Sequence, residues 1–168
     1  MLFRSYVTHD QDEALAVSDQ VALMHEGRIL QVGSPRDIYE QPASERVAAM
    51  VGDAAVFDGH ADAQGQLHLG PLALGPSRSR QGPVRLVVRP QAWRMEAASG
   101  QGLPGKVTSR AYLGRLTEYH VSTALGSLFI QRPREHTGWP AGAPVSLFLA
   151  GQDVSVLPPA ADGMPSGP

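Results

Sequence analysis

The stretch that decides the fold of the first part of this chain runs Tyr6-Val7-Thr8-His9-Asp10-Gln11-Asp12-Glu13-Ala14-Leu15. The residues from Phe3 to Thr8 are typical of a short β-strand. The side chain of Asp10 can cap a following helix, and Glu13 stands three positions later, where it completes a pair of the capping-box type. The sequence therefore predicts a strand over residues 3–8, a histidine directly after it, and a helix that runs to about Val17.

Three further elements are predicted between this helix and residue 52, and each carries its own start or turn signal. A two-residue joint that contains Gly favours a β-hairpin when strand-like runs flank it. A Ser followed by Pro favours a helix start. The Ser hydroxyl oxygen can accept a hydrogen bond from a backbone N–H of the first turn that has no partner within the helix, and Pro suits the first helical position. The predicted elements are a hairpin over residues 21–25 and 28–32 around Glu26-Gly27, a helix that Ser34-Pro35 opens and that stops before Pro42, and a helix that Ser44 caps and Gly52 ends.

From Asp53 onward the pattern of the sequence changes. Short runs of Val, Leu, Phe and Tyr alternate with Gly and Pro about every 8–12 residues, which is typical of a small β-barrel or sandwich. Residues 75–83 are predicted to form a loop, and residues 159–168 are predicted to form a disordered tail. The predicted strands cover residues 55–61, 66–69, 84–89, 93–97, 105–112, 117–123, 127–131, 145–149 and 154–157.

Composition narrows the classes of function. The chain has 168 residues and a net charge of −2, and its Arg residues are scattered, so the sequence lacks the basic stripe of a nucleic-acid-binding protein. It has no Cys, and therefore neither a disulfide framework nor a thiolate metal site can form. No apolar run approaches the roughly 18 residues of a transmembrane helix, and the first residues do not have the pattern of a signal peptide. We therefore expect a soluble, cytoplasmic protein.

A glycine-rich segment imitates a phosphate-binding loop. The run Gly100-Gln101-Gly102-Leu103-Pro104-Gly105-Lys106-Val107 fits G-x-G-x-x-G, and it fits the phosphate-loop pattern up to its last position. A phosphate loop needs a Ser or Thr hydroxyl for magnesium after the Lys, where this chain has Val107. Pro104 removes one backbone N–H that would face a phosphate, and the residues that follow favour a strand instead of the required helix. We interpret the segment as a turn before a strand.

The order and spacing of motifs in residues 6–52 resemble the end of the nucleotide-binding domain in the ATP-binding subunits of ABC importers for maltose, polyamines and ferric iron. Residues 53–158 resemble the β-rich TOBE extension of these subunits. The first resemblance rests on Gln11-Asp12-Glu13-Ala14-Leu15, Asp19, Met24-His25-Glu26-Gly27-Arg28-Ile29, Gln31-Val32-Gly33-Ser34-Pro35 and Ile38-Tyr39-Glu40-Gln41-Pro42-Ala43. The second rests on Tyr112-Leu113-Gly114, Tyr119-His120-Val121 and Gln152-Asp153-Val154.

The resemblance implies a fold class and a domain organisation. The expected class is α+β, with residues 1–52 as a C-terminal remnant of a P-loop ATPase domain, residues 53–158 as an OB-like TOBE barrel with a regulatory role, and residues 159–168 as the tail. The phosphate loop (Walker A), the signature motif and the catalytic glutamate (Walker B) of the family lie upstream of the matched region. We therefore expect a C-terminal fragment of an ATPase subunit that is not catalytic by itself.

The resemblance also implies a role for His9. In the intact parent, the matching histidine contacts the γ-phosphate of ATP and senses its presence, while an upstream glutamate acts as the base. An imidazole suits this task, because it can donate a hydrogen bond to the charge that develops on the phosphoryl oxygens. The expected cofactors of the parent are ATP and magnesium, and none is expected in this fragment.

The resemblance further implies partners, and other function classes stay open beside it. The expected partners are a second copy of the chain, in a homodimer, and the membrane-spanning permease subunits, which would hold the protein at the cytoplasmic side of the inner membrane. One alternative is a free-standing TOBE-like module that binds a small oxyanion. Another is an OB-type nucleic-acid-binding module, which the net charge disfavours.

The remaining histidines and the aromatic residues are interpreted as structural. His25 lies at the predicted hairpin joint, and the other histidines lie on separate predicted strands or loops, so no pair shows the ligand spacing of a helix or a locked hairpin. These others are His60, His68, His120 and His136. The residues interpreted as core packing instead of a stacking platform for bases are Trp93, Trp139, Tyr112 and Tyr119. The step Arg89-Pro90 is interpreted as a structural turn.

Overall fold

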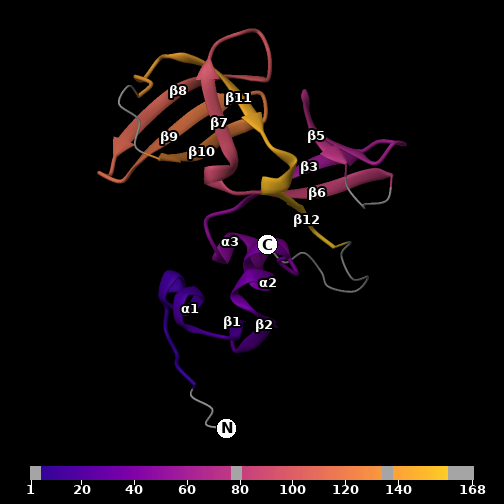
Figure 1. The fold of residues 1–168 in the computed structure, drawn as a ribbon, viewed down its shortest axis with the longest axis vertical. Coiled ribbons are helices and arrows are strands. Elements are labelled where there is room, and N and C mark those ends of the chain that lie inside the picture. Colours follow the sequence, from indigo (N-terminus) through magenta and orange to yellow (C-terminus); the bar gives the residue numbers. More distant parts are fainter. Residues whose placement is uncertain (1–4, 77–80, 134–137, 159–168) are drawn as a thin grey trace. The chain divides into compact units, whose positions relative to one another are not determined.

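The computed structural model describes residues 5–76, 81–133 and 138–158. The chain separates into two compact units, one that contains the residues up to Asp53 and one that spans Ala54–Val156; Figure 1 shows their elements along the chain. The predicted tail over residues 159–168, part of the predicted loop, and His136 lie outside the described residues.

In its described residues, the first unit consists of three short helices and one hairpin. The two hairpin strands pair antiparallel with each other, with Val21 opposite Gly33 at one end and His25 opposite Arg28 at the other. The predicted hairpin and all three predicted helices are confirmed. The elements are α1 (Gln11–Val17), β1 (Val21–His25), β2 (Arg28–Gly33), α2 (Pro35–Glu40) and α3 (Glu45–Met50).

The strand predicted before His9 is wrong for the residues that the structure describes there. Residues 5–8 have no regular secondary structure. A β-strand needs a neighbouring strand that takes up its backbone hydrogen bonds. Among the described strands, β1 and β2 pair only with each other, so this segment has no ladder to join. Local β propensity was therefore not sufficient to form the strand.

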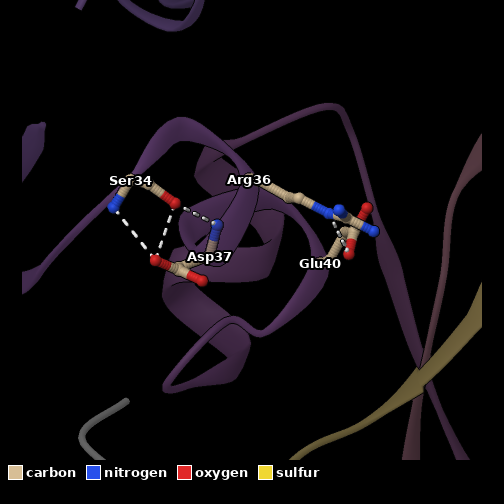
Figure 2. A network of polar contacts seen from close by, with 4 residues as sticks. All are labelled: Ser34, Arg36, Asp37 and Glu40. Carbon is tan, nitrogen blue, oxygen red and sulfur yellow. Dashed lines mark hydrogen bonds and ion pairs between the residues drawn. The ribbon is translucent and has the colours of Figure 1, made fainter. Parts of the chain in front are cut away.

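The start of α2 is fixed by a complete capping box (Figure 2). The Ser34 hydroxyl oxygen accepts the Asp37 N–H at 3.1 Å, and the Asp37 carboxylate accepts the Ser34 N–H at 3.2 Å. The Ser34 hydroxyl also donates to that carboxylate at 2.6 Å. These hydrogen bonds hold the pKa of the Asp37 carboxyl below its usual value. One turn along, Arg36 and Glu40 form an i,i+4 ion pair at 2.9 Å.

We expect Ser34→Ala to lower the free energy of unfolding of the first unit by about 1 kcal/mol at pH 7. The depressed pKa of Asp37 gives stability that is present above the unfolded carboxyl pKa of about 3.9 and is lost as pH falls through the folded value. The difference between wild type and variant should therefore shrink between pH 7 and pH 3. Urea unfolding followed by circular dichroism measures it, and a difference that grows on acidification would contradict this account.

A small apolar core closes the first unit. Ile38 of α2 and Val47 of α3 are fully buried, and Val51 joins them. Half-buried residues of the hairpin and of the helices pack against these three residues. Each helix thus turns the apolar side of its surface toward this core. The packed residues are Leu15, Val21, Leu23, Leu30, Tyr39 and Met50.

In its described residues, the second unit is built from ten strands in two antiparallel five-stranded sheets. Figure 1 shows the strands of this unit. The order in one sheet is β10-β9-β8-β11-β7, and the order in the other is β12-β6-β3-β4-β5. The strands are β3 (Ala55–Ala61), β4 (Gln66–Leu69), β5 (Leu72–Pro76), β6 (Gly82–Val88), β7 (Trp93–Ala97), β8 (Leu103–Tyr112), β9 (Leu116–Thr123), β10 (Gly126–Pro133), β11 (Pro144–Leu149) and β12 (Val154–Val156), with two 3₁₀ turns, η1 (Pro90–Ala92) and η2 (Gly151–Asp153).

One hydrophobic core lies between the two sheets of this unit. Leu69 and Leu86 come from one sheet, and Leu103, Tyr119 and Leu147 come from the other, and all five are almost completely buried. The predicted β-rich second half is thus confirmed. The helices in the described residues are few and short, so this part of the chain is mostly β, whereas the expected class was α+β.

The predicted loop over residues 75–83 is corrected at both ends. Gly75 and Pro76 complete β5, a strand that was not predicted, and Gly82 and Pro83 begin β6. These two strands of the same sheet therefore extend further than the Gly and Pro pattern indicates.

Candidate functional site

His9 lies in the turn that leads into α1, and it is exposed to solvent. The helix begins at Gln11 because Asp10 caps it: the Asp10 carboxylate accepts the Glu13 N–H at 3.0 Å, and the Asp10 carbonyl accepts the Ala14 N–H at 3.1 Å. The acidic residues Asp12 and Glu13 occupy the first turn, where negative charge suits the unsatisfied N–H groups. The predicted helix start is therefore confirmed.

The capping pair between Asp10 and Glu13 takes a relayed form. The backbone N–H of Asp10 donates to the Thr8 hydroxyl oxygen at 3.0 Å, and the Thr8 hydroxyl donates to the Glu13 carboxylate at 2.9 Å. The Tyr6 hydroxyl donates to the same Glu13 oxygen at 3.1 Å. Sequence reasoning found the pair but not the participation of Thr8 and Tyr6; a hydroxyl residue directly before the histidine was the available signal.

The arrangement presents an accessible imidazole on a turn whose neighbouring residues are hydrogen-bonded. Such an imidazole can donate to, or accept from, a ligand brought to it from outside the unit. Among the residues that the structure describes, no three His, Asp or Glu side chains come together in a way that could hold a metal ion.

Two of the other histidines are closer than the sequence indicated. His60 of β3 and His68 of β4 are directly opposite each other in the sheet, so the interpretation that no histidine pair is locked by a hairpin is wrong at this point. The His68 Nε2–H donates to the Asp62 carboxylate at 3.0 Å. This contact, together with backbone N–H groups, holds the pKa of the Asp62 carboxyl below its usual value.

His25 and His120 have partners of their own. His25 contacts the Arg46 guanidinium at 2.5 Å and lies 3.5 Å from the Glu26 carboxylate. His120 packs its ring on Phe129 with the ring centres 5.3 Å apart. Both histidines therefore serve local packing on separate elements.

The glycine-rich segment is confirmed as a turn that leads into a strand. β8 begins at Leu103 and runs through Pro104 and Val107, so no helix follows the glycines and no helix N-terminus faces a phosphate. Gly102 instead lies against the backbone of β11, where its missing Cβ would meet the Leu147 carbonyl oxygen at 2.6 Å.

The aromatic residues are mostly core residues, as interpreted. Trp93 and Tyr119 are buried, and Trp139 packs against the same core. Tyr112 is the exception, because it is 55% exposed. Arg89 is buried and precedes η1, which starts at Pro90; the interpretation of this step as a turn is confirmed.

The sequence is similar to a known domain family and to several known proteins. Residues 86–157, which lie almost entirely in the β-rich unit, match the TOBE domain family. The chain is 46% identical over 134 residues to the Fe(3+) ions import ATP-binding protein FbpC of Agrobacterium fabrum, a match that covers 74% of this chain and 37% of that protein. It is 39% identical over 158 residues to the FbpC of Brucella abortus, which covers 90% of this chain and 45% of that protein.

The chain is also similar to a polyamine import protein in sequence and to one solved structure in fold. The chain is 37% identical over 163 residues to the spermidine/putrescine import ATP-binding protein PotA of Ruegeria pomeroyi, covering 90% of this chain and 44% of that protein. A solved structure of ModG, described as a cytoplasmic molybdate-binding protein, superposes with a TM-score of 0.50 at 19% identity and covers 62% of this chain and 96% of ModG. At this identity the likeness shows the fold alone.

The part of the β-rich unit that begins at residue 86 is therefore of TOBE type. The chain is homologous to the C-terminal part of the ATP-binding subunits of ABC importers, and it spans less than half the length of the curated relatives it matches. Among the described residues, no helix has the length and apolar character needed to cross a bilayer.

Proposed function

We propose that this chain forms the C-terminal part of the ATP-hydrolysing subunit of an ABC importer. The observation that carries the proposal is the match to two import ATP-binding proteins over 90% of the chain, since a match of that extent must include both units. In this proposal the first unit completes a nucleotide-binding domain, and the TOBE-type unit has a regulatory and dimer-forming role.

His9 is the residue to which we assign a direct role. It would donate to the γ-phosphate of ATP and stabilise the charge that develops on the phosphoryl oxygens during hydrolysis. Its exposure and its place on a held turn support the assignment. ATP and magnesium would be bound by residues that precede the matched region in the longer subunit, and this chain would not hydrolyse ATP by itself.

The partners follow from the same proposal. A second copy of the subunit and the membrane-spanning permease subunits would bind the protein, and the complex would lie at the cytoplasmic face of the inner membrane. Oxyanion binding by a free-standing module stays the alternative, because the likeness to ModG is one of fold.

His9→Ala tests the proposal in a full-length subunit, in which the N-terminal part of the Agrobacterium fabrum relative precedes this chain. We expect ATP turnover to fall about 100-fold, which is typical for the removal of one group that stabilises transition-state charge. ATP binding should change little. The matched control is His60→Ala, which removes an exposed imidazole of the other unit. Turnover that survives His9→Ala unchanged would contradict the role of His9.

A further inference from the structure

The Glu13 carboxylate ties the segment before His9 to the helix after it. One oxygen of this carboxylate accepts the Tyr6 hydroxyl at 3.1 Å and the Thr8 hydroxyl at 2.9 Å. Hydrogen bonds to an ionised acceptor are stronger than those between neutral groups. Glu13 itself is fixed on α1 through its backbone N–H, which donates to Asp10 at 3.0 Å.

The Thr8 hydroxyl links the residues on the two sides of His9 through hydrogen bonds. It donates to Glu13, and its oxygen accepts the Asp10 N–H at 3.0 Å. The two chain neighbours of His9 are therefore held in one chain of hydrogen bonds that ends on the helix. The His9 residue stays exposed between them. Thr8 is held through its side-chain hydroxyl and Asp10 through its backbone N–H, and such bonds on both sides restrict the directions that a side chain on this turn can take.

We propose that Glu13 is a positioning residue for His9: acting through Thr8, it fixes the turn so that the imidazole is aimed before a phosphate arrives. The inference rests on the proposed function, because the phosphate is part of that function. A group held in place before the reaction loses less conformational freedom in the transition state, and misplacement of a reacting group lowers the rate.

The first test is made on the chain as it stands, without nucleotide. Backbone ¹⁵N relaxation reports the order parameters of residues 8–10, which are about 0.85 in rigid backbone and below about 0.6 in flexible backbone. We expect Glu13→Ala to move these three amides from the first range toward the second. Glu13→Gln should keep them rigid, because its amide oxygen can accept the same hydroxyl bonds.

Two further variants separate the tie from the stability of α1. Thr8→Val removes the hydroxyl in the middle of the chain of bonds but leaves the helix sequence untouched, and it should loosen residues 8–10 as Glu13→Ala does. Asp12→Ala is the matched control, since Asp12 is an exposed acid in the same helical turn, and it should leave them rigid. If residues 8–10 are equally ordered in Glu13→Ala, in Thr8→Val and in wild type, the inference is overturned.

The second test uses ATP turnover of the full-length subunit described above. Glu13→Ala should lower kcat about tenfold with an unchanged KM for ATP, Glu13→Gln should restore it, and the double variant with His9→Ala should be no slower than His9→Ala alone. If His9→Ala stops turnover and Glu13→Ala does not slow it, positioning by Glu13 is refuted. If His9→Ala has no effect while Glu13→Ala still loosens the turn, the proposed function fails and the tie itself is supported.

Discussion

Replacement of Trp93 by Ala is expected to lower the free energy of unfolding of the β-rich unit by about 3–5 kcal/mol. Trp93 is 2% exposed and begins β7. Its ring meets Phe57 of the other sheet edge to face, with the ring centres 6.3 Å apart, so one side chain joins the two sheets across their shared core. Truncation removes buried apolar area and leaves a cavity that the sheets cannot fill without a shift of their backbones.

Urea unfolding followed by the intrinsic fluorescence of Trp139 measures this loss, since Trp139 packs against the same core and stays in the variant. Tyr112→Ala provides the control, because Tyr112 is 55% exposed in the same unit and its truncation should change the stability by no more than about 0.5 kcal/mol. Equal unfolding midpoints for Trp93→Ala and Tyr112→Ala would show that Trp93 does not join the two sheets.

The elements that the sequence predicted well are those whose signals are local. The cap of α2 needs Ser34, Pro35 and Asp37, which are all within four positions, and the structure forms every bond of the box. The hairpin of the first unit likewise needs only its two-residue joint and the two runs beside it. In such elements the local signals all favour the same structure, so long-range contacts do not change which element forms.

The strand residues that were not predicted contain Pro, and whether a strand tolerates Pro depends on which of its sides has a neighbouring strand. β5 ends in Gly75-Pro76, which were predicted to belong to a loop. β5 is the outermost strand of its sheet, and Pro is tolerated in such an edge strand because one row of its backbone groups has no partner strand. Pro83 is tolerated in β6 for a related reason. β12 pairs only with Leu86–Val88 of that strand, so near Pro83 only β3 is a neighbour.

The candidate site divides in the same way. The position of His9 before a capped helix follows from residues 8–13 alone. The tie through Tyr6, Thr8 and Glu13 joins side chains up to seven positions apart. It starts from residues 5–8, which have no regular secondary structure although their composition favours a strand. The opposition of His60 and His68 is a matter of register, which the turn between two strands sets and which hydrophobic pattern alone does not fix.

A second large effect is expected at Gly102, in the segment that imitates a phosphate loop. Gly102→Ala should destabilise the β-rich unit by about 2–5 kcal/mol, the sum of two separate penalties. The backbone φ of +74° is unfavourable for any residue with a Cβ. The added Cβ would also stand 2.6 Å from the Leu147 carbonyl oxygen and 2.8 Å from the Phe148 ring, and the first of these belongs to the backbone of β11, which cannot turn away.

Gly100→Ala separates the two penalties, because Gly100 has nearly the same φ of +73° but its missing Cβ would meet nothing within 4 Å. It should lose only the conformational part, about 1–2 kcal/mol, so urea unfolding should rank wild type above Gly100→Ala and Gly100→Ala above Gly102→Ala. This ranking distinguishes close packing against β11 from a phosphate cradle, in which backbone approach of a ligand would be the reason for the glycines. If both variants keep wild-type stability, the glycines are not required for packing, and the interpretation of this segment as a structural turn is wrong.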